Sequence, residues 1–175
     1  MEKKRLIMDE AAMHRAMARI SYEILERNKG ADKLCIVGIL SRGVAIGKRI
    51  AEKISELEKT DVSFGQLDIT PYRDDMDASE WNELTDIPFD VNDKKIVLVD
   101  DVIFTGRSAR AAIDALIQRG RPQSVQLAVL VDRGHRELPI RPDYVGKNLP
   151  TARNEDVRVS VKEHDGNDSV TIYNS

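Results

Sequence analysis

The stretch Lys94–Ala109 reads KKIVLVDDVIFTGRSA and decides the fold of this 175-residue chain. Its apolar run, Ile96–Val99, is largely β-branched, which is typical of a strand buried on both faces of a parallel sheet. The run stops at two adjacent carboxylates, and a loop of small and hydroxyl-bearing residues follows before a helical pattern begins at Ala109. The stretch therefore predicts a strand–loop–helix unit with a polar loop at the carboxyl end of the strand.

The loop after this strand has the composition of an anion-binding site. Successive backbone N–H groups in such a loop converge on a phosphate, and the following helix adds partial positive charge at its N-terminus. Asp100 and Asp101 lie beside that loop, where carboxylates accept hydrogen bonds from ligand hydroxyls or face a Mg²⁺ hydration shell. The alternative is an acid pair that only caps loops, but the Thr-Gly-Arg-Ser sequence at Thr105–Ser108 favours a ligand.

Composition places the chain among ordinary globular proteins. Its residues are 41% hydrophobic and 33% charged, and their number suffices for a single domain, residues 1–175, with a full core. The net charge of −3 gives no general attraction for nucleic acid, so an RNA site would have to be a local basic patch. The single cysteine, Cys35, excludes an internal disulfide, and no apolar run approaches the roughly 18 residues of a membrane helix. We therefore expect a cytoplasmic protein without a membrane segment.

Hydrophobic periodicity outlines the rest of the fold. A helix is expected from Asp9, its N-cap, to about Lys29, where Gly30 ends it. The other expected elements are strands at 33–40, 62–70, 124–131, 157–161 and 170–173 and a helix at 44–58. Strands that alternate with helices in this way favour an α/β fold with a mostly parallel central sheet flanked by helices.

Two further segments carry candidate functional residues. Ser41, Arg42 and Gly43 follow the strand at 33–40, and an Arg in a tight loop at the carboxyl end of a parallel strand is well placed to meet a polyphosphate. Residues 71–93 show no clear periodicity, and a stretch of that length without structure is usually a lid or disordered. We expect a mobile lid there.

The segment VLVDDVIFTGRSA (Val97–Ala109) resembles the phosphoribosyl-diphosphate (PRPP) binding motif of type I phosphoribosyltransferases. In that family two acids hold the ribose 2′- and 3′-hydroxyls and the loop wraps the 5′-phosphate, which implies these roles for Asp100 and Asp101 and for Thr105–Ser108. The resemblance also implies that Ser41–Gly43 is a pyrophosphate loop, often built on a non-proline cis peptide, and that the lid carries catalytic residues at its base.

The resemblance assigns two overlapping sets of residues. Those implied to bind PRPP are Ser41, Arg42, Gly43, Val97, Leu98, Val99, Asp100, Asp101, Val102, Ile103, Phe104, Thr105, Gly106, Arg107, Ser108 and Ala109. Those implied to be catalytic are Arg42, Tyr72, Arg73, Asp100 and Asp101. Mg²⁺ is expected to be held mainly by PRPP and water, and not by the protein alone.

The segment PDYVGKNLP (Pro142–Pro150) resembles the hood that recognises the base in this superfamily. The resemblance implies a small hood formed by about residues 133–151 and the chain end, in which Tyr144 stacks on the base and the Val145 backbone hydrogen-bonds to its edge. Purine-salvage relatives carry an Asp just before the Thr-Gly of the PRPP loop. This chain has Phe104 there, which cannot hydrogen-bond to purine N7, so a pyrimidine is favoured.

Longer strings resemble the PyrR family of bifunctional pyrimidine operon regulatory proteins. The strings are RNKG (27–30), LDIT and YRDD within 67–75, VLVDDVIFTGR (97–107) and the whole of 126–151. The resemblance implies catalysis of uracil + PRPP → UMP + diphosphate. It also implies binding of pyr leader mRNA in response to UMP or UTP, which promotes attenuation. We expect a homodimer or a larger homo-oligomer.

The RNA-binding surface implied by the family is matched in part. Ala18 and Tyr22 stand where family members place Thr and His on the first helix, although an aromatic side chain can still stack on single-stranded RNA. The residues expected to bind RNA are Arg15, Arg19, Arg136, Arg141 and Lys147. Two alternatives stay open: a uracil salvage enzyme without significant RNA binding, and a nucleotide sensor with a vestigial active site. The intact acid pair and PRPP loop argue against the second.

Overall fold

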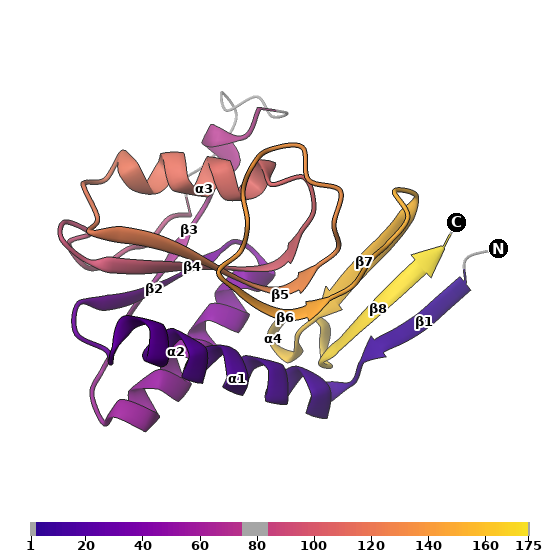
Figure 1. Cartoon of the computed structure of the whole chain (residues 1–175), viewed down its shortest axis with the longest axis horizontal. Coiled ribbons are helices and arrows are strands. Elements are labelled where there is room, and N and C mark those ends of the chain that lie inside the picture. The colour runs from indigo at the N-terminus through magenta and orange to yellow at the C-terminus, as the bar shows by residue number, and fades with distance from the viewer. Residues whose placement is uncertain (1–2, 75–83, 175) are drawn as a thin grey trace.

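The computed structural model describes residues 3–74 and 84–174, which form an α/β fold with two sheets (Figure 1). The central sheet has five parallel strands in the order β3-β2-β4-β5-β6. Their bounds are Leu34–Ile39 for β2, Ser63–Leu67 for β3, Lys95–Ile103 for β4, Ser124–Asp132 for β5 and Tyr144–Asn148 for β6. A smaller antiparallel sheet has the order β1-β8-β7, with β1 at Lys3–Met8, β7 at Glu155–Ser160 and β8 at Ser169–Asn174.

Helices cover both faces of the central sheet because its strands are apolar on both faces. α1 (Glu10–Asn28) and α2 (Arg42–Glu58) lie on one face, and α3 (Arg107–Ile117) lies on the other (Figure 1). In β4, Val97 and Val99 belong to the core beneath α1 and α2, whereas Ile96 and Leu98 belong to the core beneath α3. The short helices η1 (Thr70–Tyr72) and α4 (Lys162–Asp165) complete the elements. No helix in the described part of the chain is long and apolar enough to cross a membrane.

The ends of the first two helices follow from local sequence. Asp9 accepts a hydrogen bond from the N–H of Ala12 at 2.8 Å, and the chain leaves α1 through Lys29 and Gly30, both in left-handed conformations. α2 begins at Arg42, two residues before the predicted start. The Ser41–Gly43 segment is therefore the N-terminus of a helix, where free N–H groups are available to an anion.

The order of the strands reverses between β2 and β4. From β2 the chain moves to β3 on one side, and it then returns to place β4 on the other side of β2. In open α/β sheets, the crevice outside the carboxyl ends of the strands at such a switch point is the usual ligand site. Ser41–Gly43 follows the end of β2, and Asp100 and Asp101 lie near the end of β4, so the fold brings them to this crevice.

The predicted hood has different boundaries in the structure. β6 is the edge strand of the central sheet, paired in parallel with β5 from Tyr144 to Asn148, so it does not belong to a separate hood. The separate unit is the small sheet, and its strand β1 is absent from the sequence prediction. β1 is short and basic without clear alternation, and its pairing with β8, 162 or more residues away in the chain, makes it a strand.

The predicted lid also differs in part. Ile87 and Val91 are buried, and Asp86 forms an antiparallel bridge with Gln66 of β3. This end of the 71–93 range is therefore packed against the edge of the central sheet. Residues 75–83 lie outside the described residues, and a mobile lid over them stays a prediction.

Candidate active site

A cavity of about 470 Å³ opens at the carboxyl end of β4, beside the N-terminus of α3. The segment singled out in the sequence supplies most of its lining, through Asp100 and residues 102–109. Arg73 and Asp74 line it from the start of the predicted lid. Leu127 and Val129 of β5 form an apolar wall that the sequence analysis missed, because nothing in a buried strand distinguishes cavity-lining residues from core residues.

The loop before α3 turns on one glycine. Gly106 has φ +93°, a left-handed conformation that favours glycine, and α3 begins at the next residue. The N–H of Arg107 donates to Oγ1 of Thr105 at 3.2 Å. The N–H groups at Ser108 and Ala109 belong to the first helical turn, which has no carbonyl partners within its own helix. An anion in the cavity would therefore meet free N–H donors and the positive end of α3.

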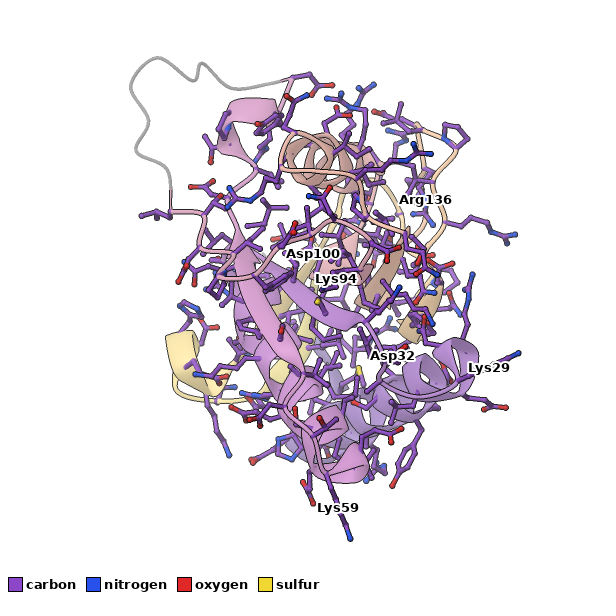
Figure 2. The ribbon with its side chains drawn as sticks, turned by 90° about the vertical axis from the view of Figure 1, so that its left-hand side faces the viewer. Lys29, Asp32, Lys59, Lys94, Asp100 and Arg136 are labelled. Carbon is purple, nitrogen blue, oxygen red and sulfur yellow. The ribbon has the colours of Figure 1, made fainter. Side chains whose placement is uncertain are left out.

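The acid pair is held by its own backbone. Oδ1 of Asp100 accepts a hydrogen bond from the N–H of Asp101 at 2.8 Å, and Oδ1 of Asp101 accepts one from the N–H of Val102 at 2.7 Å. Burial and, after it, repulsion from Asp101 raise the pKa of Asp100 well above its usual value. Figure 2 shows Asp100 in the interior of the molecule. Hydroxyl donors or a nearby cation would relieve this repulsion, so the pair fits a ribose diol and a Mg²⁺ ion bound to the same ligand.

The Ser41–Gly43 segment approaches the acid pair closely because glycines allow it. A Cβ on Gly43 would lie 2.5 Å from the carbonyl oxygen of Val99, and a Cβ on Gly38 would lie 2.6 Å from the carbonyl oxygen of Gly43. The peptide bond between Leu40 and Ser41 is cis, as the family resemblance implies. The start of α2 is thus packed directly against the ends of β2 and β4.

Both arginines expected to meet phosphate groups are paired with carboxylates. Arg42 donates from Nη2 and Nε to Asp165 of α4, at 2.8 and 3.3 Å, and this pairing lowers the pKa of Asp165. Arg107 donates from Nη1 to Asp74 at 2.7 Å and from Nε to Glu137 at 3.1 Å. A bound polyphosphate would exchange these carboxylates for phosphate oxygens.

The first residues of the predicted lid contact α3. The carbonyl oxygen of Tyr72 accepts a hydrogen bond from Nη2 of Arg110 at 3.3 Å, and the Tyr72 ring packs against the core beneath α3. Arg73 lines the cavity. The structure therefore places Arg73 at the predicted site. Tyr72, the residue before it, does not line the cavity and instead attaches this segment to α3.

The structure contradicts the predicted stacking of Tyr144 on the base, whereas the predicted role of the Val145 backbone stays a prediction. Tyr144 is 3% exposed and lies in the core beneath α1, where its hydroxyl donates to Oε1 of Gln126 at 2.7 Å. The carbonyl oxygen of Val145 accepts a hydrogen bond from Nη1 of Arg19 at 3.1 Å. Successive side chains of a strand point to opposite faces, and the register of β6 turns Tyr144 away from the cavity.

Comparison with known proteins supports this architecture. The family model described as the phosphoribosyl transferase domain matches residues 7–164. A hypoxanthine phosphoribosyl transferase of Trypanosoma cruzi has a TM-score of 0.74 at 16% identity, covering 96% of this chain and 90% of that chain. A hypoxanthine phosphoribosyltransferase of Staphylococcus aureus has a TM-score of 0.71 at 19% identity, covering 95% and 90%. These two proteins share the fold.

Curated relatives are much more similar in sequence. The bifunctional protein PyrR of Clostridioides difficile is 58% identical over 175 residues, covering 98% of this chain and 99% of that protein. The chain belongs to the PyrR family. The bifunctional protein PyrR of Bacillus subtilis is 52% identical, covering 99% and 98%, and a pyrimidine operon regulatory protein of Lactococcus lactis is 57% identical, covering 95% of each chain. The resemblance seen in the sequence is confirmed.

Three of the five residues that the PyrR resemblance implies for RNA binding meet at a second, shallower groove of about 350 Å³. Arg15 and Arg19 of α1 and Lys147 of β6 line it, together with apolar residues of α1 and β1. Arg19 is fixed there by the carbonyl oxygens of Val145, at 3.1 Å, and Gly146, at 2.6 Å. We call this surface the basic groove.

The other residues of the predicted RNA surface lie elsewhere. Arg141 is exposed but does not line the basic groove, and Tyr22, one turn beyond Arg19 on α1, is 55% exposed. Arg136 donates to the carbonyl oxygens of Phe104, at 2.9 Å, and Ile140, at 2.8 Å, and to the carboxylate of Asp132 at 2.7 Å.

The structure therefore places Arg136 beside the crevice and apart from the basic groove, and its role in RNA binding stays a prediction. Its guanidinium faces backbone of the PRPP loop, and Figure 2 shows it at the end of the molecule away from Lys29 at the end of α1. Sequence spacing could not separate Arg136 from Arg141, because both lie in one polar connection between β5 and β6.

Proposed function

We propose that this chain transfers the phosphoribosyl group of PRPP to uracil, forming UMP and diphosphate, and that it also binds pyr leader mRNA in response to uridine nucleotides. The observation that carries the catalytic half is a cavity lined by Asp100, the α3 N-terminus and an apolar wall, with the α2 N-terminus packed directly against Asp100. The basic groove carries the RNA half, since it collects Arg15, Arg19 and Lys147 in a chain of net charge −3.

In this proposal each part of the crevice holds one part of PRPP. Asp100 and Asp101 accept hydrogen bonds from the ribose hydroxyls, and the residues of Thr105–Ser108 bind the 5′-phosphate. Arg42 and the start of α2 bind the diphosphate, which takes the place of the Asp165 carboxylate. Mg²⁺, held mainly by PRPP oxygens and water and facing the acid pair, would neutralise charge on the diphosphate.

The chemistry then follows from this positioning. The bond between C1 of the ribose and the diphosphate oxygen breaks through an oxocarbenium-like transition state, and N1 of uracil forms the new bond as its proton leaves. Arg42 stabilises the departing diphosphate. Tyr72 and Arg73 hold the start of the lid, which would exclude water that competes with uracil. Leu127 and Val129 give the planar base an apolar wall.

Base preference tests the catalytic half. We expect kcat/KM for uracil to exceed that for hypoxanthine by about 10–100-fold, because a purine N7 buried against Phe104 lacks a partner, at a cost of about 1–3 kcal/mol. Steady-state assays with each base at saturating PRPP measure the ratio. Comparable turnover of hypoxanthine would contradict the assignment of a pyrimidine.

RNA binding tests the other half. Lys147→Gln should weaken binding of pyr leader RNA in the presence of UMP and reduce the salt slope of log K by about 0.7 if one phosphate contact is lost. Lys48→Gln is the matched control, since Lys48 is exposed on α2 outside the basic groove. Filter-binding titrations at several salt concentrations give both quantities. A wild-type protein that retains no leader RNA at low salt would leave only the salvage enzyme.

A further inference from the structure

Arg133 is a buried cation that the proposed reaction does not use. Arg133 is only 7% exposed. Its Nη2 donates to the carbonyl oxygens of Ala152, at 3.2 Å, and Glu155, at 2.7 Å. Its Nε is buried and has no hydrogen-bond partner among the described residues. Burial lowers the pKa of Arg133 despite the nearby charges of Asp156 and Glu155. An arginine in such a place is unfavourable unless its contacts offset the lost hydration.

The main contact of this guanidinium is the ring of Phe104. Cζ of Arg133 lies 4.0 Å from the ring centroid, within the range in which a cation is attracted by an aromatic face. His135 approaches the same ring edge-on, with ring centroids 5.8 Å apart and an angle of 71° between the planes. Phe104 lines the cavity, and its carbonyl oxygen is fixed by Arg136. The ring is therefore held on more than one side at the wall of the site.

The residues that hold this ring are themselves anchored to one segment. Thr151 donates from Oγ1 to the carbonyl oxygen of Arg133 at 2.9 Å, and Nε2 of His135 donates to the carbonyl oxygen of Thr151. The two carbonyl acceptors of the Arg133 guanidinium lie just beyond, at the start of β7. The small sheet is thus connected to the cavity wall through Arg133 and His135.

We propose that Arg133 is a positioning residue for the base: by stacking on Phe104, it fixes the ring of Phe104 at the cavity wall and sets how tightly the site holds a pyrimidine. The inference rests on the proposed transfer to uracil. Arg133 is buried and does not line the cavity, so we expect it to act through the ring and not to touch substrate. Its effect should therefore appear in the binding of the base and not in the binding of PRPP.

The chain offers a matched control for this contact. Arg158 lies over the ring of Tyr173 at 4.1 Å, nearly the same distance, but this pair belongs to β7 and β8, and neither residue lines the cavity. Lys keeps the charge of Arg but loses its planar stacking and its fork of donors. Arg133→Lys and Arg158→Lys therefore remove the same kind of contact at two places, only one of which faces the site.

We expect Arg133→Lys to raise the KM for uracil about tenfold, with the KM for PRPP and kcat changed by less than about twofold. Arg158→Lys should leave all three constants as in the wild type. In a Phe104→Leu background, Arg133→Lys should have little further effect, because the contact is already absent. Equal increases in both KM values, or effects that add in the double variant, would indicate a purely structural Arg133 and overturn the proposal.

A second variant covers the case in which the Arg133→Lys chain does not fold. Phe104→Leu removes the ring and leaves the hydrogen bonds from Arg133 to the carbonyl oxygens of Ala152 and Glu155 in place. An unchanged KM for uracil in that variant would overturn the proposal, because Arg133 could not then act on the base through this ring. A raised KM for uracil with an unchanged KM for PRPP would place the ring at the base, as the proposal requires. Absence of UMP formation by the wild-type protein would overturn the proposed function, and this inference with it. A wild type that forms UMP with the same KM for uracil as Arg133→Lys would overturn this inference alone.

Discussion

The Asp101→Asn chain is expected to fold as the wild type does and to bind PRPP about 10–100-fold more weakly. A hydrogen bond from a ribose hydroxyl to a charged carboxylate contributes about 1.5–3 kcal/mol, and an amide oxygen supplies only part of it. The fold should survive because Oδ1 of an Asn can still accept the hydrogen bond from the N–H of Val102, which is 2.7 Å long in the wild type. Titration calorimetry with PRPP and Mg²⁺ measures the loss directly.

The control for this experiment is Asp114→Asn. Asp114 lies on α3 and pairs with Arg110 at 2.8 Å, outside the cavity lining, so it changes the charge by the same amount near the site. Its effect on PRPP affinity should stay below about twofold, since exposed ion pairs are screened by water. Equal PRPP affinities of the Asp101→Asn and wild-type chains would show that Asp101 does not bind the ribose diol.

The central part of the fold could be predicted because its signals are local. The apolar run of β4, the acids that end it and the glycine that starts α3 lie within about a dozen residues, and each has one structural meaning. The same holds for α1, whose N-cap Asp9 and terminal Gly30 are both visible in the sequence. The predicted α/β fold with a mostly parallel sheet is confirmed, and so is the family.

The parts that could not be predicted depend on distant pairing. Asp165 is 123 residues from Arg42, and no local pattern indicates that a turn before β8 reaches the start of α2. The role of Tyr144 failed for a similar reason, because the register of β6 against β5 decides which face it joins. The polar connection between β5 and β6 contained several arginines, and only their hydrogen bonds separate Arg136, behind the PRPP loop, from the exposed Arg141.

A second large effect is expected at Asp168, whose carboxylate joins α1, α2 and the small sheet. Its side chain is fully buried and accepts hydrogen bonds from Nη1 and Nη2 of Arg49, at 3.0 and 2.9 Å, and from the N–H of Lys162 at 2.8 Å. Nε2 of His14 on α1 lies 3.0 Å from Oδ2. Removing one partner of a buried ion pair costs about 3–5 kcal/mol, so Asp168→Asn should lower the free energy of unfolding by about that amount.

Urea denaturation measures this change, and Asp156→Asn is the control. Asp156 pairs with Arg158 at 2.8 Å on the surface, with more than half of each side chain exposed, so its loss should cost at most about 1 kcal/mol. A similar loss of stability in both variants would mean that the buried Asp168 network stabilises the fold no more than an exposed ion pair does.

The pH dependence of stability provides an independent check on the same carboxylate. Burial alone would raise the pKa of Asp168, but the hydrogen bonds from Arg49, Lys162 and His14 outweigh it and lower the pKa from 3.8 to about 2. A lowered pKa in the folded state stabilises the fold above the unfolded-state pKa, near 4, and this contribution is lost as the pH falls through about 2. The shift corresponds to about 2 kcal/mol, so wild-type stability should fall more steeply between pH 4 and pH 2 than that of Asp168→Asn. Parallel curves for the two proteins over this range would show that the charged form of Asp168 is not what the network of Arg49 and His14 stabilises.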